Sequence, residues 1–258
     1  MLSKLAHILS KNTRLRSQNP FSSTSWFLPN NCQLCGIEGR DILCTKCVNQ
    51  FFSSSSLNHG AIDRCTICAV PLHHKAAQCG ACLKKPPAFN ATIVACDYMA
   101  PLDQLILSLK FGHRLALAPA LAKLLTKAIN NAPHSYQPDV LIPVPLSKER
   151  LAQRGFNQAL EICKPLARQI NIPCQARLLL RVRDTEQQTL LHPNQRHKNI
   201  QYAFSPNSRY KDKIRGLHIG VVDDVITTGA TLHEVAACLK RHGAASITNY
   251  VFARTPPH

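Results

Sequence analysis

The stretch Val221–Leu232, with the sequence VVDDVITTGATL, decides the fold of this chain. Its apolar start predicts a buried strand that delivers Asp223 and Asp224 to its carboxyl end, the edge at which open α/β sheets bind ligands. The loop Thr227–Thr231 is then expected to enter a helix. Backbone N–H groups, the helix N-terminus and threonine hydroxyls can together surround a phosphate dianion. The stretch therefore predicts a phosphate-binding turn between a strand and a helix.

The residues of this turn have separable tasks. Those expected to bind the phosphate are Val225, Thr227, Thr228, Gly229, Ala230 and Thr231. Gly229 lets the backbone approach the ligand closely. Two adjacent acids beside a phosphate would repel it, so Asp223 and Asp224 are expected to hydrogen-bond the hydroxyls of a ribose whose 5′-phosphate fills the turn. A metal site formed by the two acids is the alternative interpretation.

Strand and helix patterns alternate around this stretch. Strands are expected at 91–96, 140–142, 218–222 and 246–253, and helices at 102–110, 115–130, 157–170 and 231–242. Pro165 should kink the third of these helices, and Thr231 and Glu234 are spaced as a capping box for the fourth. The alternation predicts an α/β fold with a mostly parallel sheet flanked by helices.

Four CxxC pairs precede this region, namely Cys32/Cys35, Cys44/Cys47, Cys65/Cys68 and Cys79/Cys82. A CxxC turn aims two thiolates at one point, and two such turns complete a tetrahedron around Zn²⁺. Eight thiolates fill two structural sites, so the nearby His59, His73 and His74 are expected to be bystanders. The spacing leaves open whether each quartet is sequential or the pairs interleave. Redox chemistry or disulfides are the alternative.

Changes in composition divide the chain into three parts. Residues 1–26 are expected to be a basic, disordered tail, with an organellar transit peptide as the alternative. Residues 27–87 form the cysteine module, and 88–258 the α/β domain. No apolar run approaches the ~20 residues that cross a bilayer, so no membrane span is expected. The remaining cysteines are interpreted as buried apolar residues: Cys96, Cys163, Cys174 and Cys238.

The chain is strongly basic, with 31 Lys and Arg against 14 Asp and Glu and a formal net charge of +17. Two zinc ions held by eight thiolates would lower this charge and still leave an excess of cations. Such an excess indicates an anionic partner, either phosphates, nucleic acid or both. The aromatic content of 6% is low for a base-stacking surface. Any nucleic-acid binding is therefore expected to depend on phosphates and to weaken with salt.

The twelve residues Val221–Leu232 resemble the phosphoribosyl-pyrophosphate (PRPP) signature of type I phosphoribosyltransferases. Two further runs, Ile142–Leu146 (IPVPL) and Arg154–Gln158 (RGFNQ), resemble the ComF/GntX branch of that family. The cysteine module, the segment Leu109–Gly112 and the stretch Gln187–Phe204 match the same branch. The resemblance covers about residues 27–254, and the chain is identified as similar to ComF-type competence proteins with a double zinc ribbon.

The resemblance implies a type I phosphoribosyltransferase-like fold that binds PRPP with Mg²⁺, with Asp223 and Asp224 as the catalytic pair. The family holds the diphosphate in the turn after an earlier strand, which assigns to it Pro143, Val144, Pro145, Lys148, Arg150, Arg154 and Lys110. The segment Arg181–Arg215 takes the place of the family's flexible hood, and contains Gln187, Gln188, Arg196 and Asn199. A solvated helix face and an ordinary exposed loop are the alternatives for these residues.

The resemblance also implies a role in natural transformation, in which incoming single-stranded DNA is handled in the cytoplasm. The implied partners are PRPP, single-stranded DNA and other DNA-uptake proteins. Three functions stay open. The chain is an active transferase that displaces diphosphate from C1 of PRPP with an acceptor that the sequence does not identify, or a DNA-binding module whose pocket senses PRPP, or a non-catalytic regulator gated by PRPP.

Overall fold

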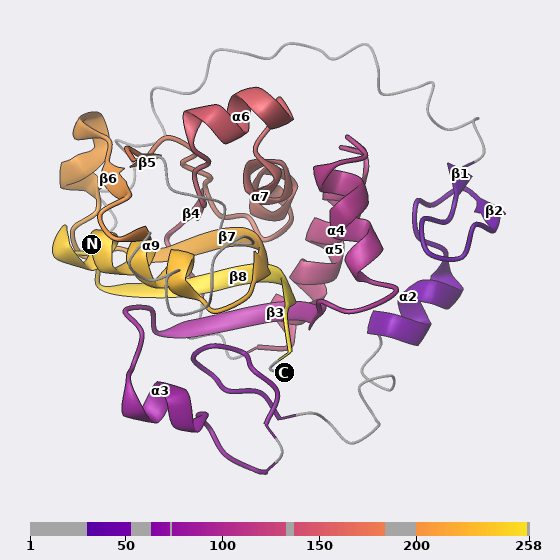
Figure 1. The fold of residues 1–258 in the computed structure, drawn as a ribbon, viewed down its shortest axis with the longest axis horizontal. Coiled ribbons are helices and arrows are strands. Elements are labelled where there is room, and N and C mark those ends of the chain that lie inside the picture. Colours follow the sequence, from indigo (N-terminus) through magenta and orange to yellow (C-terminus); the bar gives the residue numbers. More distant parts are fainter. Residues whose placement is uncertain (1–29, 53–62, 73, 133–136, 184–199, 257–258) are drawn as a thin grey trace.

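The computed structural model describes residues 30–52, 63–72, 74–132, 137–183 and 200–256, and the tail expected at 1–26 lies outside these ranges. A parallel four-stranded sheet forms the centre, in the order β3 (Ala91–Asp97), β8 (Ser246–Arg254), β7 (His218–Ile226) and β4 (Val140–Pro143) (Figure 1). β7 and β8 lie in the middle of the sheet and are apolar along most of their length, as strands covered on both faces are. The predicted α/β architecture is confirmed.

Helices cover both faces of the sheet. α4 (Asp103–Lys110), α5 (Leu117–Asn130) and α7 (Gln158–Gln169) share one core with Val222, Tyr250 and Phe252. α9 (Ala230–Arg241) packs on the other face with Val221 and Val251. Alternate strand residues point to opposite faces, which is why neighbours such as Val221 and Val222 belong to different cores. None of the helices in the described part of the chain is long and apolar enough to cross a membrane.

The shorter elements surround this framework. They are β1 (Asn30–Asn31), β2 (Glu38–Gly39), α2 (Thr45–Phe52), α3 (Gly80–Lys84), α6 (Lys148–Arg154), β5 (Leu179–Arg181), β6 (Phe204–Pro206) and the 3₁₀ helix η4 (Ser208–Lys213). β1 and β2 pair antiparallel within the first cysteine segment. β5, whose last residue Arg181 begins the segment expected to be the hood, pairs antiparallel with β6 inside that segment.

Two expectations about the elements are corrected. The capping box is wrong, because α9 begins at Ala230 and its N-cap is Gly229, whose left-handed backbone (φ +79°) turns the chain into the helix. The backbone N–H of His233 donates to the Gly229 carbonyl (2.8 Å), and Glu234 accepts instead from the backbone N–H of Tyr202 (3.1 Å). β7 also runs four residues beyond the predicted strand, to Ile226. The helix over 157–170 is present as α7 and continues through Pro165.

The two cysteine segments pack against different parts of the α/β domain. In the first segment, Phe52 lies against Phe252 of β8, with ring centroids 6.2 Å apart, and Lys127 of α5 donates to its carbonyl (3.0 Å). In the second segment, the carbonyl of Thr66 accepts a hydrogen bond from the backbone N–H of Thr92 (3.2 Å), on the edge strand β3. The boundary between a 27–87 module and an 88–258 domain stays a prediction.

The cysteines outside the CxxC pairs lie mostly inside the domain. Cys96, Cys163 and Cys238 are buried, as expected, whereas Cys174 is only half-buried. The Sγ atoms of Cys163 and Cys174 are 3.4 Å apart. The interpretation of Cys174 as a buried apolar residue is therefore corrected: it follows α7 and is partly buried, packed against the core that contains α5.

Candidate functional site

The turn between β7 and α9 has the strand–turn–helix form expected from its sequence. Asp223 and Asp224 occupy the last part of β7, and Thr227 and Thr228 follow it as exposed residues. The Thr228 hydroxyl accepts a hydrogen bond from the backbone N–H of Ala230 (3.4 Å), at the start of α9. The first backbone N–H groups of a helix have no partner within it, so the turn presents donors suited to an anion.

Asp224 is 3% exposed and ionised. Burial alone would raise its pKa, but the Lys110 ammonium, which forms an ion pair with the carboxylate, holds the pKa below its ordinary value together with hydrogen bonds from neighbours. One of these donors is the Gln158 amide (3.4 Å), whose oxygen accepts from Arg154 (2.9 Å). Residues of α4 and α7 thus contact one carboxylate of β7, and Arg154 of α6 holds the Gln158 amide that donates to it.

Asp223 has the opposite electrostatic character. It is half-buried, and burial together with the adjacent charge of Asp224 raises the pKa of its carboxyl group well above the ordinary value. Its carboxylate accepts the backbone N–H of Asp224 (2.9 Å). A ligand that offers hydroxyl donors or a cation would stabilise the ionised form of Asp223.

The basic turn after β4 is held in place by caps. Ser147 is the N-cap of α6, where its hydroxyl accepts from the backbone N–H of Arg150 (3.3 Å), and Gly155 ends the helix in a left-handed conformation (φ +76°). Asn157 caps α7 and donates its amide to the carbonyl of Val144 (3.0 Å). The RGFNQ run therefore fixes the orientation of the proline-flanked turn that precedes it.

One cavity of about 630 Å³ joins the acidic turn to the basic turn. The expected site residues that line it are Asp223, Asp224, Val225, Thr227, Thr231, Val144, Pro145, Arg150, Arg154 and Lys110. Five other expected residues are adjacent in sequence and are not part of its wall: Pro143, Lys148, Thr228, Gly229 and Ala230. Acidic, basic and apolar side chains therefore face one cavity. Its volume is large enough for a sugar with phosphate groups at both ends.

Sequence reasoning missed part of the cavity wall, namely Tyr98, Leu107, Phe111, His113, Gln153 and Gln158, whereas Leu146 belongs to the IPVPL run and Arg181 begins the expected hood. Phe111 is 66% exposed, and the Arg154 guanidinium lies over its ring at 5.5 Å from the centroid. Gln158 could have been found, because it ends the RGFNQ run and directly follows the cap Asn157. No local pattern marks Tyr98 or His113, which follow β3 and α4 and reach the cavity only through the packing of these elements in the folded domain.

The expected hood is described in part. Arg181, in β5, lines the cavity and lies over the ring of Phe204 at 5.8 Å from its centroid. Residues 184–199 lie outside the described residues, and the expected contributions of Gln187, Gln188, Arg196 and Asn199 fall there.

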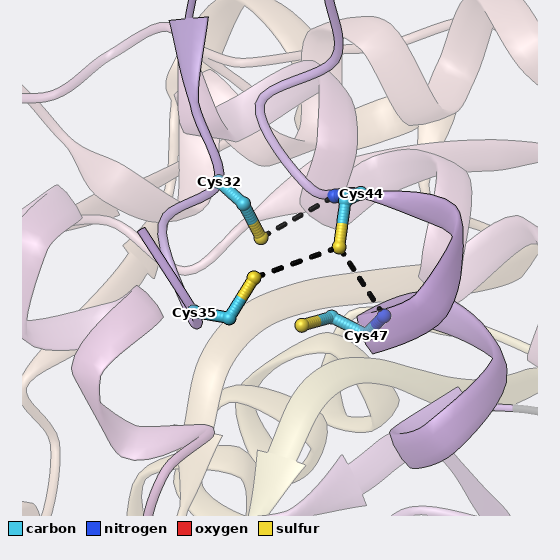
Figure 2. A group of neighbouring side chains, drawn as sticks. All are labelled: Cys32, Cys35, Cys44 and Cys47. Carbon is cyan, nitrogen blue, oxygen red and sulfur yellow. Dashed lines mark hydrogen bonds between the residues drawn. The ribbon is translucent and has the colours of Figure 1, made fainter. Parts of the chain in front are cut away.

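The eight CxxC cysteines form two sequential groups of four, with all ligand atoms in a group within 4.8 Å of one another. The first tetrad is Cys32, Cys35, Cys44 and Cys47 (Figure 2), and the second is Cys65, Cys68, Cys79 and Cys82. The interleaved pairing is thereby excluded. His74 is exposed and belongs to neither tetrad, while His59 and His73 lie outside the described residues.

The geometry of both tetrads fits a tetrahedral metal ion. Sulfur atoms bonded at ~2.3 Å to Zn²⁺ lie about 3.8 Å apart, and the Cys35–Cys44 and Cys68–Cys79 sulfurs are 3.7 Å apart. Burial would raise the pKa of Cys32, but backbone N–H donors lower it to about 6, which favours the thiolate that a metal requires. A four-sulfur shell leaves no open position, so each tetrad suits a structural ion.

Comparison with known proteins agrees with this geometry. The phosphoribosyl transferase domain model matches residues 113–257. The chain is 35% identical over 237 residues to the DNA utilization protein YhgH of Salmonella typhimurium, a match that covers 88% of this chain and 98% of that protein. It is 34% identical over 215 residues to competence protein F of Haemophilus influenzae, covering 82% and 90%. It is 36% identical over 117 residues to competence protein ComFC of Bacillus subtilis, covering 45% of each.

The matched model spans the basic turn, the acidic turn and three of the four sheet strands. The cysteine tetrads lie before that model and inside the region shared with YhgH over nearly its whole length. Carrying both a phosphoribosyl transferase domain and this extended similarity, the chain belongs to the ComF-type family of phosphoribosyltransferase-like proteins.

Proposed function

We propose that this chain binds PRPP with Mg²⁺ in the 630 Å³ cavity and acts in the cytoplasm on the use of incoming single-stranded DNA in natural transformation. The observation that carries the proposal is the meeting of two turns in one cavity: the acidic pair Asp223–Asp224 with its phosphate loop, and the cations Arg150 and Arg154. The names of the relatives, DNA utilization protein and competence protein, supply the biological context.

Different residues of the cavity would bind different parts of PRPP. Donors of the loop Thr227–Thr231 would bind the 5′-phosphate, because a helix N-terminus favours negative charge. Asp224, ionised beside Lys110, and Asp223 would accept hydrogen bonds from the ribose hydroxyls. Binding of those hydroxyls would compensate the burial and charge repulsion that raise the pKa of Asp223.

The other end of the ligand would lie at the basic turn. Arg150 and Arg154 line the cavity on the side of β4 and supply charge-assisted donors for a diphosphate. The donor set fits a magnesium complex, since Asp223 is a half-buried carboxylate in the same cavity that an adjacent cation would stabilise. When bound, Mg²⁺ neutralises charge on the diphosphate.

Transfer of the phosphoribosyl group is the second candidate function, and exposed Phe111 favours it. Its ring is 66% exposed at the cavity wall, next to Arg154, and leaves an apolar surface on which an acceptor can lie. In that reaction a nucleophile forms a bond to C1 of the ribose while the bond to the diphosphate oxygen breaks, and Arg150 and Arg154 stabilise the leaving group. Diphosphate release in the presence of candidate nucleophiles separates an enzyme from a ligand-gated regulator.

Two structural zinc ions complete the proposal, one in each cysteine tetrad. Each cysteine segment has only short helices and strands, so it contains little core of its own. A structural zinc site contributes roughly 10–16 kcal/mol of binding free energy to folding, which is enough to order such a segment. Native mass spectrometry of the full chain should give two zinc ions per chain.

The decisive experiment is a calorimetric titration of the full chain with PRPP and Mg²⁺. Replacing both Asp223 and Asp224 by Ala should abolish binding, while the matched control Asp212→Ala, on the exposed 3₁₀ helix η4, should bind as the wild type does. Retention of single-stranded DNA should survive the double substitution. Unchanged PRPP affinity in the double variant contradicts the assignment of the site.

DNA binding is tested separately. Charge reversal at Arg196 and Lys198, in the segment outside the described residues, should weaken DNA binding and flatten its dependence on salt, since each lost phosphate contact lowers the slope by about 0.7 for single strands. An unchanged affinity for DNA would show that the hood is not part of the DNA-binding surface. Loss of DNA retention together with PRPP binding in the Asp223 and Asp224 variant would join the two activities in one site.

A further inference from the structure

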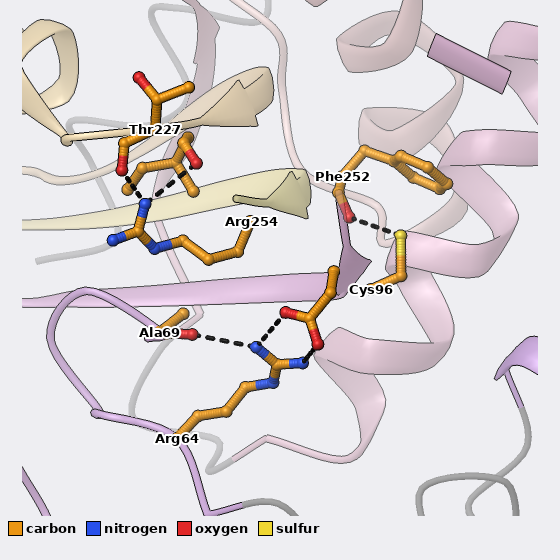
Figure 3. A network of polar contacts seen from close by, with 8 residues as sticks. Arg64, Ala69, Cys96, Thr227, Phe252 and Arg254 are labelled. Carbon is orange, nitrogen blue, oxygen red and sulfur yellow. Dashed lines mark hydrogen bonds and ion pairs between the residues drawn. The ribbon is translucent and has the colours of Figure 1, made fainter. Parts of the chain in front are cut away.

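Cys163 and Cys174 form a thiol pair that belongs to neither cysteine tetrad and does not line the cavity. Their Sγ atoms are 3.4 Å apart and share a hydrogen bond. Cys96 shows the other arrangement of a buried thiol, since its Sγ donates to the backbone carbonyl of Phe252 (3.6 Å; Figure 3). In the thiol pair, by contrast, two sulfur atoms contact each other directly.

Both cysteines of the pair are held by the framework of the domain. Cys163 lies in the middle of α7 and is fully buried. After α7 the chain returns along β4, an edge strand of the sheet, where Cys174 lies opposite Leu141. The N–H of Leu141 donates to the Pro173 carbonyl and the N–H of Gln175 to the Leu141 carbonyl, each at 2.8 Å. The separation of the two sulfur atoms is therefore set by a helix and by the edge of the sheet.

The two thiols differ in reactivity. A hydrogen bond from the Cys163 thiol lowers the pKa of Cys174, and the charge of Lys164 acts in the same direction against the effect of burial. The same hydrogen bond, together with burial, raises the pKa of Cys163 well above its ordinary value. Cys174 is also the half-buried member of the pair. It is therefore the thiol that an external reagent can reach, and the thiolate is the nucleophilic form.

The geometry of the pair suits a second reaction step at the buried thiol. Atoms held about 3–3.5 Å apart are already placed for attack on one another, and the two sulfur atoms lie within this range. A disulfide bond is about 2.05 Å long, so side-chain movements that close about 1.4 Å complete it. In the described part of the chain, no third His, Cys, Asp or Glu joins the pair at ligand distance. The pair therefore lacks the ligands that a structural metal ion needs.

We propose that Cys163 and Cys174 are a reversible redox site that reacts with small disulfides. The Cys174 thiolate attacks one sulfur of the reagent, the S–S bond of the reagent breaks, and a mixed disulfide forms with release of one small thiolate. The Cys163 thiol then attacks Sγ of Cys174, its proton passes to the leaving sulfur, and the second small thiol departs. The protein thiols lose two electrons and the reagent gains them, so one disulfide replaces another.

The new bond would join two elements that support the basic turn. At the start of α7, Asn157 donates to the Val144 carbonyl (3.0 Å). The next residue, Gln158, donates to Asp224 (3.4 Å). β4 leads into the same turn at Pro143. Oxidation would therefore link α7 covalently to the segment that pairs with β4 and reduce the freedom of both supports.

The test uses the full chain with its metal ions and hydroxyethyl disulfide, a small neutral reagent. Trypsin cleavage after Arg168 places Cys163 and Cys174 in separate peptides. The expected product is a cross-link between these two peptides that disappears after treatment with dithiothreitol. The intact chain should lose the mass of two hydrogen atoms and keep its metal content. Absence of the cross-link, or disulfides confined to the tetrads with loss of metal, overturns the proposal.

Single substitutions separate the roles of the two thiols. Cys163→Ser should stop at the mixed disulfide on Cys174 and gain the mass of one mercaptoethanol group, because the second thiol is missing. Cys174→Ser should form neither product, since the remaining thiol is buried. Urea unfolding is measured for both variants, and an acid-quenched time course of the wild type shows the order of the steps if Cys163→Ser does not fold. A mixed disulfide that forms first on Cys163 contradicts the assigned roles.

Cys96→Ser and Cys238→Ser are the matched controls. The Cys238 thiol is also buried and donates to a carbonyl, that of Phe204 (3.4 Å). Both variants should form the bond as the wild type does. Oxidation should raise the unfolding temperature of the wild type and the controls by a few degrees, because the bond constrains the unfolded chain. An equal rise in Cys163→Ser, or a cross-link that forms only in urea, contradicts the proposal.

Discussion

Lys110, the last residue of α4, forms an ion pair with Asp224 of β7, and it does so inside the cavity that both residues line. Asp224 is almost completely buried, so its negative charge depends on this cation and on the Gln158 amide. The pair keeps one acid of the acidic turn ionised before any ligand arrives. It also ties the helix that carries Phe111 at its end to the central sheet.

Removing the cation should therefore destabilise the fold. Lys110→Met is expected to lower the free energy of unfolding by about 3 kcal/mol at pH 7, because a buried carboxylate left without its partner keeps its desolvation cost. Urea unfolding followed by circular dichroism measures the change. Adding Asp224→Asn to Lys110→Met should recover part of the loss, since the uncompensated charge is then absent.

The exposed pair Lys164–Glu161 on α7 provides the control. Its N–O distance is 2.7 Å, but water screens it, so Lys164→Met should cost less than about 1 kcal/mol. If Lys110→Met and Lys164→Met lose the same amount, burial of Asp224 does not set the strength of the Lys110 pair.

Asp223 should give the stability a pH dependence of unusual sign. Its pKa is raised by burial and by Asp224, so the folded chain keeps this proton to a higher pH than the unfolded chain, in which an Asp pKa is about 3.9. Between these pKa values the folded state binds more protons, and the free energy of unfolding falls as pH rises from about 4. Asp223→Asn should remove that fall and stabilise the chain at pH 7.

Urea unfolding between pH 4.5 and 8 tests this expectation, with the exposed Asp41→Asn as the control that should shift stability by less than about 0.5 kcal/mol. Asp224 affects stability in a separate, lower pH range. Its lowered pKa contributes to the free energy of unfolding, and this contribution is lost only as the pH falls through the pKa of Asp224 in the folded chain. A wild-type profile that is flat above pH 5 would show that Asp223 is not perturbed.

The framework of the fold was accessible from the sequence because its strands are short apolar runs with clear stops. Pro143 ends β4, and the alternation with helices identifies a parallel sheet. β7 was predicted too short, since Asp223 and Asp224 do not resemble strand residues. Pairing with β8 sets where β7 ends. Asp223 is opposite Val251 of β8, and the pairing of the two strands continues past the two acids to Ile226. Tertiary contacts override local propensity there.

The site was predictable where its residues are consecutive in the chain. The acidic turn and the RGFNQ run each form a local structure, so their sequences specify it. Tyr98 and His113 could not be found, because each reaches the cavity only after distant elements have packed. Arg254 donates to the carbonyls of Ile226 and Thr227 at the start of the phosphate loop (Figure 3). It was missed for the same reason: an arginine at the end of a strand has the appearance of an exposed charge, but β8 lies between β7 and β3, and Arg254 is 9% exposed.

Gly229 should be difficult to replace because of its backbone conformation. Its φ is +79°, a region that costs other residues roughly 1–2 kcal/mol. A Cβ there would meet Ile226 Cδ1 at 3.6 Å, which is ordinary contact, so the cost comes from the backbone. Gly229→Ala should lower the free energy of unfolding by about that amount and weaken PRPP binding, since the turn must open to relieve the strain.

Gly39→Ala is the comparison, because this glycine lies in β2, has no neighbour within 4 Å of the added Cβ and has no positive φ. It should change stability by less than about 0.5 kcal/mol. Thermal unfolding and calorimetry on both variants give the result. Wild-type stability and affinity in Gly229→Ala would mean that the turn does not depend on the left-handed residue.

Substitution of single cysteines in the first tetrad should show whether these thiols bind zinc or only pack against one another. Cys35 is exposed, whereas Cys47 of the same tetrad is 5% exposed. If the thiols only pack, Cys47→Ser destabilises the chain and Cys35→Ser does not. If they hold one Zn²⁺, both substitutions leave one ion per chain and lower the unfolding temperature alike, because a structural zinc needs four ligands.

The loss should reach the α/β domain, since the first cysteine segment contributes Cys32, Leu43, Cys47 and Phe52 to the core that contains α5. Cys35→Ser should therefore increase hydrogen exchange in α5 as well as in the segment itself. Cys238→Ser, a buried cysteine on the opposite face of the sheet, controls for loss of a thiol and should retain both zinc ions. Two zinc ions in Cys35→Ser, with wild-type exchange in α5, would contradict the tetrad as a metal site and leave its sulfur geometry without a function.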